Sequence, residues 1–391
     1  MSVTAVKLDD SEANLNYSDF VHTDPGTLAG RFMRMFWQPV YRSQDLAPGK
    51  VVPIRIMGED FTLYRGESGA AHLLAPRCAH RETQLSVGRV EGDCIRCFYH
   101  GWKYEASGQC VEQPAEDVSF AAKIRIRSYP VEEYLGLVFA YLGEGTAPLL
   151  PGFKEFETDG VLEVETFLRP CNYFNDLDNA CDPLHVTFVH GDSRININRF
   201  IDAANLSAEE NEFGLSITMP RTTHGGGLRI NQYGMPNIQM LKLPAVDKAE
   251  SEWRDFLSWR VPVNDYEYVS FNLNMVHING DEAARYKTAR AEAFAKATAT
   301  AAELAPDVLA GRTTIEEVKQ RIPDVVRLQD DVVLVAQGVI PDRSQDHLGR
   351  SDVGVILLRK IWRRELEAMA KGQPIKRWTR APEIVATSGL S

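Results

Sequence analysis

The chain has 391 residues, of which 44% are hydrophobic and 25% are charged, the composition of a globular protein of two or three domains. Its formal net charge of −11 argues against a nucleic-acid or anionic-membrane partner, because both attract positive charge. No apolar run approaches the ~18 residues of a membrane span, and the polar N-terminus lacks the pattern of a signal peptide. Because the six cysteines show no evident pairing pattern, a cytoplasmic location is expected.

Residues 1–38 are expected to form an N-terminal arm and one helix. Residues 1–24 are polar and show no periodicity, which predicts a loose arm. The helix is predicted over 25–36, with Asp24 as its N-cap, Pro25 in its first turn and apolar residues recurring on one side.

Residues 39–148 are predicted to form an all-β domain, because short β-rich runs alternate with turn residues. Strands are expected over 51–57, 61–64, 71–74 and 137–141. The stretch 146–152, which contains proline and glycine, is the best candidate for a domain boundary.

Two Cys/His pairs within this β domain form the most specific motif of the chain. Cys78 and His80 are arranged as C-x-H, and Cys97 and His100 follow as C-x-x-H. One cysteine and one histidine in each half suit a [2Fe–2S] centre in which thiolates hold one iron and imidazoles hold the other. A zinc site can use the same ligands, although zinc motifs usually pair cysteine with cysteine and histidine with histidine. The spacing therefore predicts a Rieske-type cluster, with zinc as the alternative.

Residues 149–391 are predicted to form a mixed domain in which helices cover an antiparallel sheet, so that the whole chain is of the α+β class. Strands are expected over 215–219, 227–233 and 256–261. Helices are expected over 172–190, 281–305, 314–321, 324–340 and 353–370, with Pro306 and Pro323 ending the second and third.

The expected helix over 172–190 carries the residues of a possible second metal site: Asp182, His185 and His190. Two imidazoles and one carboxylate can form the facial triad that leaves positions open on Fe(II). On a regular α-helix the two histidines would point ~140° apart, so their convergence requires a π-like widening or a helix end. Asp182 followed by Pro183 is also a good N-cap, and two unrelated histidines are the alternative to a metal site.

A third iron ligand has to come from elsewhere in the chain. Asp330 and Asp331 lie on the helix expected over 324–340. Adjacent helical residues point ~100° apart, so only one of the two carboxylates can face the iron. A solvated acidic pair is the alternative.

Together these motifs resemble those of the Rieske non-haem iron oxygenases, as the catalytic α subunit carries them. The stretches 77–81 and 97–104 are similar to the two cluster-binding loops, and the D-x-x-H-x-x-x-x-H pattern over 182–190 is similar to the mononuclear iron motif. The stretches 24–40, 259–263 and 342–352 resemble the phthalate-dioxygenase-like branch of this family.

The resemblance implies a role for each site residue. Cys78, His80, Cys97 and His100 would hold the cluster, and His185 and His190 would hold the mononuclear iron. In the family the ligand Asp stands seven residues before a Gln of the kind of Gln337, which selects Asp330 and leaves Asp331 as the fallback. Asp182 would join His185 to a cluster histidine of a neighbouring subunit, here His100, and carry electrons between the two sites, and Asn179 would support the iron ligands.

The implied function is that of an oxygenase component. It would use O₂ and electrons from an NAD(P)H-dependent reductase or a ferredoxin to oxidise a small substituted aromatic compound, as a homotrimer. A monooxygenase reaction is expected, by ring or alkyl hydroxylation or by O- or N-dealkylation, and ring cis-dihydroxylation is the alternative. The substrate pocket is expected over about 215–275, where no cluster of Arg or Lys indicates an acidic substrate. A Rieske electron carrier is the alternative from another class, but a carrier needs only the ~100-residue β domain.

Overall fold

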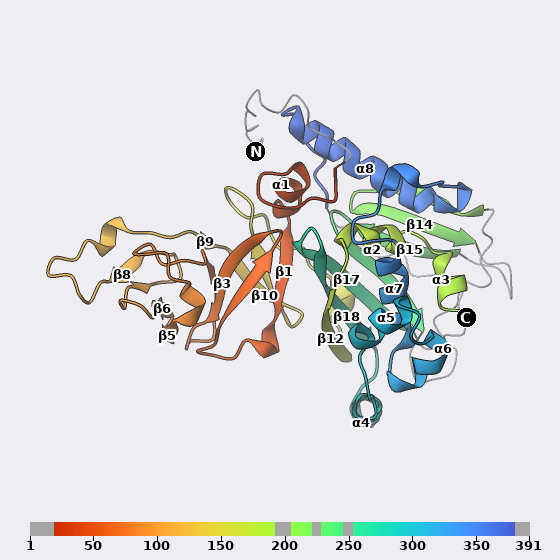
Figure 1. Cartoon of the computed structure of the whole chain (residues 1–391), viewed down its shortest axis with the longest axis horizontal. Coiled ribbons are helices and arrows are strands. Elements are labelled where there is room, and N and C mark those ends of the chain that lie inside the picture. The colour runs from red at the N-terminus through yellow and green to blue at the C-terminus, as the bar shows by residue number, and fades with distance from the viewer. Residues whose placement is uncertain (1–18, 192–204, 221–227, 245–252, 380–391) are drawn as a thin grey trace. The chain divides into compact units, whose positions relative to one another are not determined.

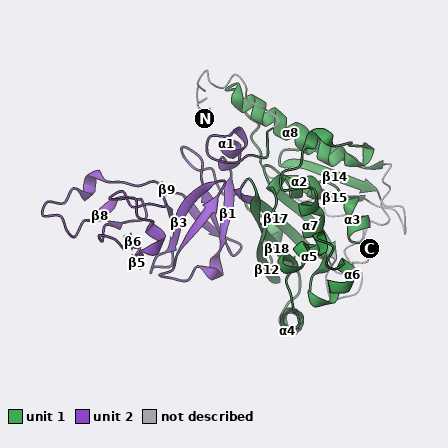
Figure 2. Ribbon diagram, viewed as in Figure 1, with its two compact units in different colours: residues 1–21, 151–260, 265–391 green, residues 22–150, 261–264 purple. Residues whose placement is uncertain are grey.

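The structure is a computed structural model that describes residues 19–191, 205–220, 228–244 and 253–379 (Figure 1). These residues form two compact units, which Figure 2 shows in different colours. Unit 2 comprises residues 22–150 and 261–264, and unit 1 comprises the described residues outside these two ranges. No helix within the described ranges is long and apolar enough to cross a membrane.

Unit 2 combines one short α-helix, α1 (Leu28–Arg34), with three antiparallel sheets among its described residues. Its strands are, in spatial order within each sheet, β1 (Trp37–Arg42), β11 (Leu137–Tyr141) and β10 (Val131–Tyr134); β2 (Val51–Ile56), β3 (Glu59–Arg65), β4 (Ala71–Leu74) and β9 (Ser128–Tyr129); and β5 (Arg89–Glu91), β6 (Cys94–Arg96), β7 (Lys103–Tyr104) and β8 (Cys110–Glu112). The four strands predicted in this region are all present.

The first helix begins later than predicted. Its N-cap is Thr27, whose hydroxyl accepts a hydrogen bond from the backbone N–H of Gly30, and not Asp24. Gly26 adopts a φ of +95°, which no helix accommodates, so Pro25 belongs to a turn. Of the predicted loose arm, residues 1–18 lie outside the described residues, whereas Phe20 is buried and its ring stacks on that of Phe174 at 4.1 Å.

Unit 1 is organised around a seven-stranded sheet. Its spatial order is β12 (Val161–Arg169), β18 (Glu267–Val276), β17 (Trp253–Asn264), β16 (Ile238–Pro244), β15 (Leu228–Gly234), β14 (Gly214–Pro220) and β13 (Ser207–Glu210). In the antiparallel pair of β12 and β18, Arg169 lies opposite Tyr268 and Glu163 lies opposite Asn274. Because side chains alternate along a strand, Glu163, Glu165, Phe167 and Arg169 point to one face of the sheet.

The helices of unit 1 complete the α+β architecture. They are α2 (Tyr173–Ala180), α3 (His185–Val189), α4 (Gly280–Ala295), α5 (Ala301–Leu309), α6 (Ile315–Val318), α7 (Val325–Ala336) and α8 (Val353–Ala370). Helix α8 packs along β13 and β14, and helices α7 and α8 both contact α2 (Figure 1). The predicted fold class, an all-β domain followed by a helix-covered antiparallel sheet, is confirmed.

Two helix predictions are wrong in detail. The helix expected over 172–190 is interrupted at 181–184, where Pro183 has no N–H to donate. The helix expected over 281–305 is two helices, and Pro306 lies inside the second rather than ending it. The start of that second helix is set by a capping box, in which Thr300 and Glu303 each accept a hydrogen bond from the other's backbone N–H.

Candidate metal centres

The first cluster loop lies between β4 and β5. The backbone N–H of Cys78 donates to the carbonyl of Thr83 at 2.8 Å, and the N–H of Glu82 donates back to the carbonyl of Cys78 at 3.0 Å. Glu82 takes a φ of +58°, an uncommon conformation for a side-chain-bearing residue that tight functional turns often contain. The loop thereby holds Cys78 and His80 in one compact turn.

The second cluster loop joins β6 to β7 and is also closed by two backbone hydrogen bonds of its cysteine. The N–H of Cys97 donates to the carbonyl of Trp102 at 2.8 Å, and the N–H of Gly101 donates to the carbonyl of Cys97 at 3.1 Å. Gly101 has a φ of +76°, so glycine is the natural residue there. The guanidinium of Arg96 donates to the Gly101 carbonyl at 2.6 Å and also binds Glu91 and Glu112, which ties the loop to β5 and β8.

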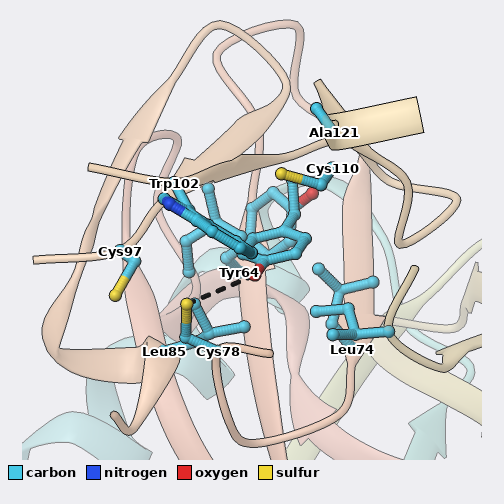
Figure 3. Close-up of a cluster of buried hydrophobic side chains, with 11 residues drawn as sticks. Tyr64, Leu74, Cys78, Leu85, Cys97, Trp102, Cys110 and Ala121 are labelled. Atoms are coloured by element: carbon cyan, nitrogen blue, oxygen red, sulfur yellow. Dashed lines mark hydrogen bonds between the residues drawn. The ribbon is translucent and has the colours of Figure 1, made fainter. Parts of the chain in front are cut away.

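The four predicted cluster residues lie together at the ends of these loops. The rings of His80 and His100 are 4.4 Å apart between centroids, and the sulfur atoms of Cys78 and Cys97 face the same space at the edge of the buried core (Figure 3). Trp102 stacks flat on His80 at 4.6 Å.

The hydroxyl of Tyr104 lies 3.2 Å from the sulfur of Cys78 and accepts a hydrogen bond from the N–H of Ala79 at 3.1 Å. Trp102 and Tyr104 are both buried, and each also touches one of the four predicted cluster residues. Their contacts would fix the orientation of His80 and the surroundings of the Cys78 sulfur.

The chemistry of this donor set fits a [2Fe–2S] cluster. Both Cys78 and Cys97 are buried free thiols, and Nδ1 of His80 is buried without a hydrogen-bond partner in the part of the chain that the structure describes. A buried nitrogen without a partner is costly unless it has a ligand. The nearby Cys94, on β6, is also a free thiol.

The second centre is assembled where the predicted helix over 172–190 breaks. His185 is the first residue of α3 and His190 is its C-cap, so the two histidines sit at the ends of a helix too short to separate them. Their ring centroids are 5.5 Å apart. Ligand atoms of His185, His190 and Asp330 all lie within 4.8 Å of one another, the spacing of donors around a single ion.

Each histidine of this centre is oriented by an acceptor at Nδ1. The Nδ1–H of His185 donates to the backbone carbonyl of Asp182, and that of His190 donates to the side-chain carbonyl of Gln329 at 2.8 Å. Since these oxygens can only accept, the proton resides on Nδ1 and Nε2 of each ring is left to bind a metal.

Asp330 completes the group from α7. One of its carboxylate oxygens lies 3.2 Å from Nε2 of His190. Burial disfavours the charged forms of both side chains, but their mutual contact outweighs it, so the pKa of His190 is raised and that of Asp330 is lowered from the ordinary values. Asp330, His185 and His190 would hold a mononuclear iron.

Asp331 faces away from this group. Its carboxylate accepts a hydrogen bond from Nε of Arg169 at 2.6 Å. Arg169 also donates to Asp176 at 2.9 Å and to the hydroxyl of Tyr268 at 2.7 Å, and Arg260 reaches the same Asp176 at 3.2 Å. These buried charges join β12, β17 and β18 to α2 and α7, and so position the helix that carries Asp330.

The structure places Asp182 beside His185 and Asn179 beside Asp330. The Oδ1 atom of Asp182 accepts hydrogen bonds from the backbone N–H groups of Leu184 at 2.9 Å and His185 at 3.4 Å. Its carboxylate therefore caps the turn before α3, while its backbone carbonyl orients the His185 ring. Asn179 contacts Asp330 only at the limit of a hydrogen bond, 3.5 Å.

A small cavity lies beside α2. It is lined by Leu177, Cys181, Leu215, Tyr233, Met235 and Leu358, among others. The hydroxyl of Tyr233 donates to the carbonyl of Ala180 and thereby links β15 to the end of α2. Of the segment expected to form the pocket, residues 221–227 and 245–252 lie outside the described residues.

This fold and these two donor sets define a class of protein, an oxygenase subunit with two iron centres. Comparison with known proteins agrees with this class. The family model described as "Rieske [2Fe-2S] domain" matches residues 36–130. The "Tert-butanol monooxygenase / tert-amyl alcohol desaturase oxygenase subunit" of Aquincola tertiaricarbonis is 31% identical, over 92% of this chain and 78% of the relative. The "5,5'-dehydrodivanillate O-demethylase oxygenase subunit" of Sphingobium sp. is 28% identical, over 92% and 82%.

Among solved structures, "Pseudomonas putida CBB5 NdmB" has the same fold, with a TM-score of 0.66 at 19% identity over 91% of this chain and 96% of that one. The chain belongs to the Rieske non-haem iron oxygenases, as an oxygenase subunit. Its cofactors are a [2Fe–2S] cluster and a mononuclear iron.

Several residues that support the predicted site residues have no recognisable signal in the sequence. Gln329 is next to Asp330 in the sequence, but its hydrogen bond with His190 forms only in the folded chain. Arg169 ends strand β12, which was not predicted, and its partner Asp176 was hidden in an expected helix. No local sequence pattern predicts this network, because Tyr268 and Asp331 lie 99 and 162 residues from Arg169 along the chain.

Proposed function

We propose that this chain inserts one oxygen atom per turnover into a substituted aromatic compound, most often by hydroxylating an alkyl carbon next to oxygen or nitrogen. The group formed by His185, His190 and Asp330, in the same chain as a Rieske domain, is the observation that carries the proposal. The iron, when bound, would supply the activation of O₂. One oxygen atom enters the substrate and the other leaves as water, with two electrons from the donor.

The protein's own part in such a reaction is mainly positioning. When a carbon bonded to oxygen or nitrogen is hydroxylated, its bond to that oxygen or nitrogen breaks spontaneously. The products are an aldehyde and a phenol or amine, and the protein need not assist this step. The chain therefore has only to hold the alkyl carbon at the iron, and such orientation contributes a large part of the rate of many enzymes. The names of two relatives, an O-demethylase and a monooxygenase, support this choice.

We further propose the assignment of the site residues. Cys78, His80, Cys97 and His100 would hold the cluster, and Asp182 would join His185 to His100 of a neighbouring copy within a homotrimer. The division into an arm with one helix (1–38), a Rieske domain (39–148) and a catalytic domain (149–391) is part of the same proposal. The six free cysteines are consistent with a reducing, cytoplasmic location.

Metal analysis of variants tests this assignment. The wild-type protein is expected to be brown and to contain about three irons per chain. Cys78→Ser should lose the colour, whereas His185→Ala and Asp330→Ala should keep the colour and lose only the third iron. Asp331→Ala is the matched control, because its carboxylate faces Arg169 and should leave the iron content unchanged. Zinc in place of iron, without visible absorption, would refute the assignment.

Mass spectrometry with isotopically labelled O₂ tests the reaction type. A substrate found by screening with a surrogate reductase should give a product carrying one labelled oxygen, or an aldehyde and a dealkylated product. Ring dihydroxylation is the second candidate, because another relative is named "Phenoxybenzoate dioxygenase subunit alpha" and is 29% identical over 90% of this chain. Two labelled atoms in one diol would establish that alternative and leave the metal assignment intact.

A further inference from the structure

Two consecutive residues of helix α7 contact the two ring nitrogens of His190. The side-chain oxygen of Gln329 accepts the hydrogen bond from Nδ1 at 2.8 Å, and a carboxylate oxygen of Asp330 lies 3.2 Å from Nε2. Consecutive helical residues point ~100° apart, so the imidazole lies between two side chains that diverge from α7. His190 is only 1% exposed, and water is therefore poorly placed to replace either contact.

The neighbours of Gln329 on α7 fix the rotation of the helix that presents it to His190. Leu328 is fully buried, and Asp331 accepts a hydrogen bond from Arg169 at 2.6 Å. Each of the residues 328–331 therefore has a defined contact, and Gln329 cannot turn away from His190 by a rotation of α7 without breaking the others.

The contact with Gln329 is one that metal binding would leave in place. A metal ion held by this group would take up Nε2 of His190 and the carboxylate of Asp330, whereas Gln329 engages the opposite nitrogen. Such an acceptor fixes the orientation and the tautomer of a histidine ligand. His185 is held in the same way by the main-chain carbonyl of Asp182, which a substitution cannot remove, but the acceptor of His190 is a side chain.

The acceptors of both histidines carry no charge, although carboxylates are close by. The carboxylate of Asp182 accepts from main-chain N–H groups, and that of Asp331 faces Arg169. Asp324 also acts electrostatically on His190, but from an exposed position at the start of α7, where water screens its charge. Within the described residues, Asp330 supplies the single carboxylate of the donor group.

This charge count favours a divalent ion over a trivalent one. With one carboxylate and two neutral imidazoles as ligands, a divalent ion leaves one positive charge uncompensated and a trivalent ion leaves two. Uncompensated charge is costly at a buried site. A carboxylate in place of the Gln329 amide would reduce this cost and would make His190 a more basic ligand, and both effects would stabilise the trivalent ion.

We propose that Gln329 is a positioning residue that acts on the mononuclear iron through His190, and that its uncharged oxygen keeps this iron in the ferrous state. The ferrous state is the one in which a two-histidine, one-carboxylate site reacts with O₂. This inference rests on the proposed function, which assigns the iron to His185, His190 and Asp330.

The affinity for Fe(II) tests the positioning role without turnover. The full chain with its cluster in place is dialysed without oxygen against Fe(II) buffered by a chelator, and the iron bound beyond the cluster is measured. Gln329→Leu removes the acceptor and should weaken Fe(II) binding about 10- to 100-fold. Gln329→Glu restores an acceptor of the same size and should bind Fe(II) at least as tightly as the wild type.

The midpoint potential of the mononuclear iron tests the electronic role. A redox titration followed by EPR spectroscopy measures it, because high-spin ferric iron gives a signal distinct from that of the reduced cluster. Gln329→Glu should raise the affinity for Fe(III) relative to Fe(II) by at least about tenfold, which lowers the potential by about 59 mV for one electron. The matched controls are Gln320→Leu and Gln320→Glu, which change an exposed glutamine shortly before α7 and should alter neither the affinity nor the potential.

Three results would overturn the proposal. The first is a wild-type Fe(II) affinity in Gln329→Leu. The second is an equal loss of Fe(II) in Gln329→Leu and Gln329→Glu, since packing alone would then explain both. The third is a potential in Gln329→Glu that matches that of Gln320→Glu, and this measurement remains possible even if the leucine variant does not fold. A wild-type protein that binds no iron beyond the cluster would instead refute the proposed function.

Discussion

Asp182→Asn is expected to lower the turnover rate by about 100-fold, the upper end for groups that support metal ligands, while both metal centres stay filled. An asparagine keeps the Oδ1 acceptor that binds the N–H groups of Leu184 and His185, so the turn before α3 should persist. What is lost is the negative charge proposed to join His185 to a cluster histidine of a neighbouring subunit. Single-turnover reduction of the iron site, followed by stopped-flow spectroscopy, measures the electron-transfer step directly.

Asp324→Asn is the matched control for this experiment. Asp324 caps α7 in the same way, by accepting a hydrogen bond from the N–H two residues later, that of Val326. Its substitution removes the same charge and should leave electron transfer unchanged. If Asp182→Asn turns over at the wild-type rate, Asp182 is only a cap and the proposed bridge does not exist.

Arg169→Met is expected to cost about 3–5 kcal/mol of the free energy of unfolding, the range for removing one partner of a buried ion pair. Burial raises the pKa of Asp331 even beside Arg169, whereas for Asp176 the pull of Arg260 and Arg169 overcomes burial and lowers the pKa. Without Arg169 both carboxylates lose their closest cation. The unfolding temperature should fall by about 10 °C, measured by calorimetry on the metal-loaded protein.

Two comparisons make this prediction specific. Arg312→Met removes an arginine whose ion pair with Asp307 is exposed, and should change stability by less than about 0.5 kcal/mol. Adding Asp331→Asn to Arg169→Met should recover part of the loss, because one unpaired buried carboxylate is then neutral. A loss no larger than that of Arg312→Met would mean that the buried network contributes little.

The parts of the fold that sequence patterns predicted well are those with strong local signals. Helix α8 has the predicted bounds because its apolar residues recur with helical spacing from Val353 to Ala370. Strands β4 and β11 likewise have their predicted bounds. By contrast β12, β16 and β18 were missed, because polar residues such as Glu163, Glu165 and Asn274 point to the helix-covered face and break the expected alternation of apolar and polar residues.

For the metal sites too, residues that are close in the sequence could be predicted, whereas contacts between distant residues could not. The cluster residues occur within 23 positions of one another, so their spacing predicts the donor set. Two histidines five residues apart cannot converge on a regular helix, so the sequence predicted an irregularity there. It did not predict that the helix would break at residues 181–184. The tautomers of His185 and His190 depend on a backbone carbonyl and on Gln329, 139 residues away in the case of His190, and no spacing rule reaches that far.

The positions of the two donor sets along the chain have a consequence for cofactor loading. All four proposed cluster ligands lie between residues 78 and 100 of unit 2, whereas the proposed iron site needs Asp330 and Gln329 in addition to His185 and His190. During synthesis, domains fold as units and N-terminal segments become available first. The cluster can therefore be inserted while most of unit 1 is still unmade, but iron cannot be captured until α7 has left the ribosome and docked. A cell short of iron–sulfur assembly would then accumulate a full-length chain with a finished iron pocket and an empty cluster loop.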